Sequence, residues 1–265
     1  MTLTGEGGSG KTWLAAQLCA GTRSSIRKDD TMITKAPAPS STAIGDVGGL
    51  AGPAAGLLFT TAIAGAGRLA KDPFPAPGSS AEVIRTYYRR SARAARFNVA
   101  CQALSILAQS RYVVTMARVA SRHRTHPRLL TGAVLVAGRA AVAALATSAA
   151  FQASLTVPKD DRTDNEVLAT TRRVFVAGGP VHGVAYGAFT AATAVAAHNT
   201  GLLRRTGAVL GVLSTTANLV TPAYFRWEPT GWLIPIGRFS GYILSAVIGV
   251  RLATKRTRPT FAQHS

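Results

Sequence analysis

The sequence has few acidic residues and little charge for its length. Only 11 of its 265 residues are Asp or Glu and 30 are Lys or Arg, so 15% are charged while 47% are hydrophobic. Uncharged runs of 18 or more residues are rare in soluble domains, because a helix that faces water needs polar residues on one side. Such runs recur in this chain, which indicates a protein of the lipid bilayer.

Cysteine and the common catalytic patterns are also scarce. Cys19 and Cys101 are the only cysteines, so no disulfide framework is predicted. The apolar runs contain no C-x-x-C, H-E-x-x-H or G-x-S-x-G pattern and no acidic pair. His182 is the only histidine well inside such a run, whereas haem between helices usually needs two axial ligands. We therefore expect no cofactor, no metal and no catalytic residue, and the pattern favours a noncatalytic protein.

The net charge of +19 raises the question of nucleic-acid binding. In this sequence, however, the arginines mostly flank the apolar runs and form no continuous basic face. Lys and Arg in that position attract anionic headgroups and set the orientation of the spans. We therefore expect membrane lipids as partners, and no nucleic acid.

Six runs are long enough to cross the roughly 30 Å hydrocarbon core at about 1.5 Å per residue. They lie at about residues 47–67, 97–117, 130–158, 174–203, 206–225 and 229–250, and the third begins either near residue 130 or after Arg139. We predict an all-α polytopic membrane helix bundle with about six transmembrane helices over residues 47–252. A poorly ordered segment, 1–46, is expected before it and a basic cytoplasmic tail, 253–265, after it.

The connections between these runs predict a surface helix, a loop and an orientation. Ser79 and Glu82 form a capping-box pattern that begins an amphipathic helix over 80–96. The polar stretch KDDRTDNE at 159–166 is predicted to be a loop. Counting Lys and Arg near the span ends gives 15 on the N-terminal side of the membrane and 12 on the other. This difference predicts that both termini are cytoplasmic.

The N-terminal segment carries GEGGSGKT at residues 5–12, which matches the P-loop pattern. The surrounding LTGEGGSGKTWLA resembles the P-loop start of bacterial signalling ATPases, a likeness that covers about the first 20 residues. It implies nucleotide binding by Gly5, Gly10, Lys11 and Thr12. A P-loop needs a strand before it and a parallel sheet around it, but only four residues precede this one. An ATPase relic, a fusion scar or a misassigned start is therefore our preferred interpretation.

Residues 1–40 are therefore predicted to be unnecessary for folding in the membrane. A chain that lacks them should accumulate in the membrane fraction as the full chain does, because the apolar runs insert on their own. Fractionation with immunoblotting measures this. Nucleotide binding by the purified full chain, lost in the shortened chain, would instead favour the ATP-binding alternative.

A few polar residues inside the runs are candidates for ligand binding. Each Arg near the midplane costs about 2.5–3.5 kcal/mol on insertion scales, and such residues commonly mark functional sites. Arg238 lies far from both ends of its run and is the strongest candidate for binding an anionic substrate or a lipid phosphate. The full candidate set is Arg238, His182, Arg139, Arg111 and Asn218. No Asp or Glu lies inside a predicted span, which disfavours a carboxylate-driven pump.

Glycines spaced by four recur in the predicted spans. Gly179, Gly183 and Gly187 form one ridge that lets another helix approach closely. Pro180 should kink this span, and the freed backbone beside His182 is where we expect a cavity. We predict that the ridge packs on another span and that His182 faces the bundle interior.

The layout over about residues 45–255 resembles small six-span bacterial membrane proteins of unknown function, of actinobacterial type. It has an amphipathic Tyr/Arg helix, an acidic loop after the third span, and Trp and Pro before the last. The likeness implies no activity. Abundant Ala, Arg and Gly is typical of high-GC bacterial genomes, so we expect the cytoplasmic membrane. The first hypothesis is a bundle that binds or moves a small anionic or lipidic ligand. An alternative is a structural or partner-binding protein, such as a homo-oligomer formed through exposed glycine ridges.

Overall fold

A computed structural model describes residues 47–254 apart from 124, 160 and 228–231. The chain divides into a unit at Met1–Thr42 and a unit at Ala43–Ser265, and the described residues all belong to the second. The predictions for segment 1–46 and for Gly5, Gly10, Lys11 and Thr12 lie outside the described residues. So does most of the predicted basic tail.

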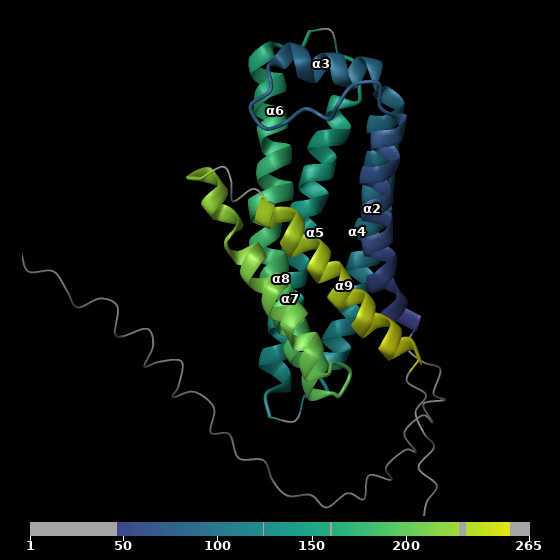
Figure 1. The fold of residues 1–265 in the computed structure, drawn as a ribbon, viewed down its shortest axis with the longest axis vertical. Coiled ribbons are helices and arrows are strands. Elements are labelled where there is room, and N and C mark those ends of the chain that lie inside the picture. The colour runs from purple at the N-terminus through teal and green to yellow at the C-terminus, as the bar shows by residue number, and fades with distance from the viewer. Residues whose placement is uncertain (1–46, 124, 160, 228–231, 255–265) are drawn as a thin grey trace, which may run out of the picture. The chain divides into compact units, whose positions relative to one another are not determined.

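Every regular element in the described residues is helical, which confirms the all-α prediction (Figure 1). The elements are η1 (Val47–Leu50), α2 (Ala51–Leu69), α3 (Ala81–Arg90), α4 (Ala92–Ala120), α5 (Pro127–Leu155), α6 (Asp164–Val176), η2 (Ala177–Val181), α7 (His182–Asn199), α8 (Arg205–Leu219), η3 (Thr221–Phe225) and α9 (Leu233–Thr254).

Four segments are long and apolar enough to cross a membrane. They are Val47–Leu69, Pro127–Leu155, Gly207–Phe225 and Leu233–Thr254. Of the six predicted spans, the second and the fourth are not among them. Their helices, α4 and α6 with α7, are long but contain polar and basic residues that lower their mean hydropathy.

The helices form a bundle in which long rods pack along their lengths. α4 packs against α2 and α5, α5 packs against α7, and α9 packs against both α8 and α2. Helix α3 lies across one end of the rods (Figure 1). The third apolar run is helical from Pro127, so Arg139 lies inside its helix and does not mark its start.

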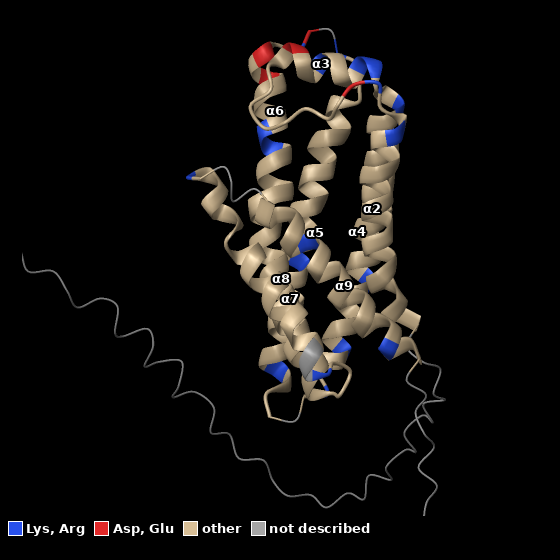
Figure 2. Cartoon of the chain, viewed as in Figure 1, with Lys and Arg blue, Asp and Glu red and all other residues tan. Residues whose placement is uncertain are grey.

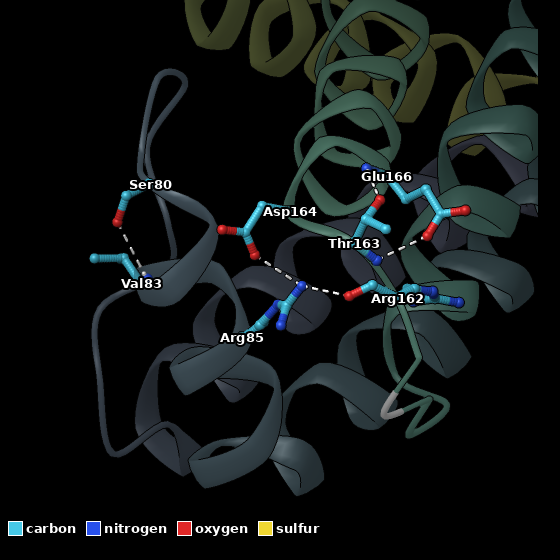
Figure 3. Close-up of polar contacts among 7 residues, drawn as sticks. All are labelled: Ser80, Val83, Arg85, Arg162, Thr163, Asp164 and Glu166. Carbon is cyan, nitrogen blue, oxygen red and sulfur yellow. Dashed lines mark hydrogen bonds and ion pairs between the residues drawn. The ribbon is translucent and has the colours of Figure 1, made fainter.

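The end of the bundle at α3 is tied together by polar contacts (Figure 3). Arg85 on α3 pairs with Asp164 at 2.9 Å and donates to the carbonyl oxygen of Arg162 at 2.5 Å. The surface helix was predicted over 80–96, but it ends at Arg90, and residues 92–96 belong to α4. Its cap is Ser80, whose hydroxyl accepts from the Val83 N–H, and not Ser79. The predicted loop 159–166 is shorter than expected, because Thr163 and Glu166 form a capping box that begins α6 at Asp164.

The glycine ridge packs inside the chain, as predicted. A Cβ atom on Gly183 would lie 2.5 Å from the Thr221 hydroxyl, and one on Gly187 would lie 2.9 Å from the Asn218 Cβ. At Gly179 the nearest atom, on Ile234, would be 3.6 Å away, which is an ordinary contact. Because Gly183 and Gly187 are buried against η3 and α8, this ridge is not available for a homo-oligomer contact.

Candidate functional site

The site is built around a break in the helix that contains Pro180. Residues Ala177–Val181 form a π-helical turn between α6 and α7, where Pro180 provides no backbone N–H. Neighbouring side chains donate to carbonyl oxygens at this turn. Ser148 donates to Val174 at 2.9 Å, and Arg238 donates to Gly178. Irregular backbone of this kind is tolerated within a bilayer where the surrounding protein supplies the missing hydrogen bonds.

Arg238 on α9 meets His182 at the start of α7. The Arg238 Nη2 lies 3.1 Å from His182 Nδ1. Because an arginine only donates, Nδ1 is the acceptor and the neutral ring carries its proton on Nε2. The His182 side chain is fully buried, and its ring stacks on that of Tyr186 with 5.2 Å between the ring centres. This burial confirms its predicted inward orientation.

The guanidinium of Arg238 is held on several sides by this chain. It lies 4.9 Å from the centre of the Phe59 ring on α2, in cation–π geometry. Two nitrogens remain buried with no partner among the described residues, namely Arg238 Nε and His182 Nε2. Native proteins leave few such groups unsatisfied, so Arg238 Nε marks a place for ordered water or a polar ligand atom, and His182 Nε2 a place for ordered water.

Arg238 lines a cavity of about 700 Å³, here called the Arg238 cavity. Most of the wall comes from α2, α4, α5, α9, the end of α6 with the π turn, and the connection between α2 and α3, and single residues of α3 and η3 complete it. Most of the surface is apolar, with rings and aliphatic side chains that include Phe59, Ile63, Leu145, Phe175 and Ile234. An apolar cavity with a few polar groups is the usual form of a small-molecule site, and this volume is within the usual range.

The polar part of the wall is an amide cluster on α4 and α5. Gln102 donates from one nitrogen to Asn98 at 3.1 Å and to Gln152 at 3.2 Å. The Gln152 side-chain nitrogen is buried without a partner among the described residues.

Asp72 also lines the cavity. Its Oδ1 atom lies 3.4 Å from Arg90 Nη1, and its Oδ2 atom has no partner in the described part of the chain.

The structure brings together only part of the candidate set. Arg238 and His182 meet, whereas Asn218 is buried away from the cavity lining and donates to the Ser214 carbonyl at 2.8 Å. Arg111 and Arg139 are exposed on the outer surface of α4 and α5. They do not line the Arg238 cavity.

Sequence reasoning missed the residues that complete the site. The amide cluster, Asp72, Tyr186 and Tyr242, whose ring centre lies 5.7 Å from that of Tyr186, were not singled out. For some of them the sequence contains a signal, which is a spacing of four residues between polar side chains. This spacing separates Tyr186 from His182, Tyr242 from Arg238, and Gln102 from Asn98. Residues four apart share a helix face, so polar pairs at this spacing inside apolar runs indicate an inward-facing surface. No such signal pointed to Asp72, which lies in a loop.

Comparisons with family models, curated proteins and solved structures found no match to this chain. Its function is therefore argued from the chemistry of the Arg238 cavity alone.

Proposed function

We propose that this chain is a noncatalytic, six-span protein of the cytoplasmic membrane that binds an amphipathic ligand in the Arg238 cavity. The polar end of the ligand carries an anionic group, which Arg238 binds, and its apolar part lies along the rings and aliphatic side chains of the wall. The observation that carries the proposal is a guanidinium held at the wall of a large apolar cavity.

The surroundings of Arg238 favour an anion. Among the described residues no carboxylate lies within ion-pair distance of it, since the ion pairs there join Arg85 to Asp164 and Arg90 to Asp72. Water is scarce in an apolar cavity, so attraction between a cation and an anion is stronger there than in bulk water. Because Arg238 Nη2 donates to Gly178 and His182, the Nε–H and the Nη1 group are left to donate to a carboxylate or a phosphate.

The fixed position of Arg238 favours binding further. The Gly178 carbonyl and the His182 ring accept its hydrogen bonds, and the Phe59 ring lies against it. A side chain that is already held in place loses less conformational freedom when a ligand binds. His182 is buried behind Arg238 and does not line the cavity, so we assign it a positioning role.

The orientation of α4 supports its assignment as a membrane span. This helix buries the polar residues Asn98, Ser105 and Gln109, while Leu104 and Leu107 are exposed. A helix on the surface of a soluble domain has the opposite arrangement. Polar residues in membrane helices face the bundle interior, where they find partners.

Helix α7 has the same arrangement. It buries His182, Thr190 and Thr193 and exposes Val184 and Val195. Four other segments are long and apolar enough to cross a membrane. With α4 and the α6–α7 rod, the proposed number of spans is six. An even number of spans brings both termini to one side, and the excess of Lys and Arg on that side predicts that it is cytoplasmic.

A photoactivatable long-chain fatty acid with a diazirine on its chain tests the proposal. In membranes that contain the full chain, we expect cross-links at Ile63, Leu145 and Ile234, because these side chains line the cavity. Peptide mass mapping locates the cross-links. Excess oleate should remove them, whereas oleyl alcohol, which has no charge for Arg238 to bind, should compete less well.

Labelling of the outer surface provides the internal control. Val136 and Val212 are 73% and 66% exposed and lie on α5 and α8. Cross-links there report general contact with dissolved fatty acid and should resist competition. Cross-links confined to such positions, with none in the cavity, would overturn the proposed function.

A further inference from the structure

A second pocket lies at the end of the bundle that α3 covers. It has a volume of about 380 Å³ and is bounded by α3, the start of α4, the end of α5 and the connection that follows α5. Its basic side chains are Arg85, Arg89, Arg96, Lys159 and Arg162. We call it the basic pocket. No acidic residue is among its lining residues, all of which belong to the described part of the chain.

Two of the five cations are held in place by the fold (Figure 3). Arg85 pairs with Asp164 at 2.9 Å and also donates to the Arg162 carbonyl. Arg162 in turn donates from its guanidinium to the Ser154 carbonyl at 2.9 Å. These bonds link α3, the 156–163 connection and the end of α5, so the pocket wall is a defined structure.

The other three cations form no ion pair with a described residue. Within the described ranges, no carboxylate lies within ion-pair distance of Arg89, Arg96 or Lys159. Figure 2 shows basic residues on α3 and at the start of α4, at this end of the bundle. Charges of one sign gathered around a concave surface concentrate a field that attracts a counter-ion.

Much of the remaining lining of the basic pocket is apolar and is here called the apolar floor. It is formed by Ile84, Tyr88, Leu155, Val157 and Val167. Burial is the main cause that raises the pKa of Tyr88 well above its ordinary value, and the neighbouring Tyr87 raises it further. The Tyr88 hydroxyl therefore stays protonated near neutral pH and is able to donate a hydrogen bond to an anion.

We propose that the basic pocket binds a phosphate group, either in the headgroup of an anionic phospholipid or as free phosphate. Several cations around one space match a group that has several anionic oxygens, and guanidinium groups bind phosphate through paired hydrogen bonds. The apolar floor beside the cations suits a molecule that carries apolar atoms next to its phosphate.

The proposal also accounts for an anomaly in the charge distribution. The arginines from Arg85 to Arg96 lie on the side of the membrane that the count of Lys and Arg assigns to the outside. Positive residues there oppose the predicted orientation. Binding a phosphate provides a reason for cations at this position that does not depend on orientation.

The test uses the full chain, purified in a neutral detergent, with three probes: dioctanoyl phosphatidic acid, inorganic phosphate and dioctanoyl phosphatidylcholine. Thermal unfolding is followed as each probe is titrated. We expect phosphatidic acid to stabilise the protein in a saturable way and zwitterionic phosphatidylcholine not to do so. Equal stabilisation by inorganic phosphate would identify free phosphate as the ligand, and an effect of the lipid alone would identify a headgroup.

The decisive variant is a double one, in which Arg89→Gln and Arg96→Gln are combined. Arg93→Gln is the matched control. All three arginines are exposed, but Arg93 does not line the basic pocket. Removing two cations should weaken phosphatidic acid binding by roughly tenfold or more, and removing Arg93 should change it less than about twofold. The Arg238→Gln variant should keep the effect, which separates this pocket from the Arg238 cavity. Equal weakening by the double variant and by Arg93→Gln, or no stabilisation by any phosphate probe, would overturn the proposal.

Discussion

Cross-linking of the photoactivatable fatty acid at the cavity side chains is expected to fall by roughly tenfold or more when Arg238 is replaced by Gln. A hydrogen bond to a charged group contributes about 1.5–3 kcal/mol, and about 1.4 kcal/mol corresponds to a factor of ten in affinity. Gln is polar and shorter, so the variant removes the charge without placing a bulky group in the cavity. The yield at Ile63, Leu145 and Ile234, relative to the outer surface, is the measurement.

Arg139→Gln is the matched control for this experiment. Arg139 also lies within an apolar helix, but it is exposed and does not line the Arg238 cavity. Its removal should leave the cross-links unchanged. Equal yields from the two variants would contradict a role for Arg238 in ligand binding.

A second variant tests the cavity without altering Arg238. Ile63 lines the cavity and is 50% exposed, so its replacement by Trp narrows the cavity with little cost to core packing. Cross-links at Leu145 and Ile234 should decrease in Ile63→Trp. The Ile63→Trp variant therefore tests the proposed site even if Arg238→Gln reduces the stability of the fold.

Replacing Gly183 with Leu is expected to destabilise the folded protein by about 3 kcal/mol, near the upper end of the usual cost of overpacking. The first added atom would lie 2.5 Å from the Thr221 hydroxyl. That hydroxyl donates to the Asn218 carbonyl at 2.7 Å and lies 3.5 Å from the Pro180 carbonyl, so it has little freedom to move aside. Thermal unfolding of the purified chain in detergent measures the change.

The control for Gly183→Leu comes from the same helix. Ala188 is exposed on α7, so Leu at that position points away from the packed face and should be tolerated. Residue spacing alone predicts that Leu is also tolerated at Ala185, about 200° around the helix from Gly183, but Ala185 is partly buried against the core and is a poorer control. Identical unfolding temperatures for Gly183→Leu and Ala188→Leu would show that the close approach of α7 to η3 does not contribute to stability.

The all-α class and the approximate positions of the long helices could be predicted from the residues alone. The length and spacing of the apolar runs decide these features, because a run without charges must avoid water wherever it lies. The break at Pro180 and the packing of Gly183 and Gly187 were also readable. Both depend on backbone chemistry that is local to a few residues, namely a missing N–H and a missing side chain.

Which polar residues meet depends on how the helices pack against one another. Arg238 and His182 are 56 residues apart, and their contact depends on how α9 and α7 are rotated about their axes. The same rotations leave Arg111 and Arg139 on the outer surface, although in the sequence they resemble Arg238. Helix rotation is set by the packing of all neighbouring side chains together, so no single run of residues contains it. For the same reason the amide cluster and the basic pocket, whose residues are up to about 50 to 80 positions apart, appear only in the folded bundle.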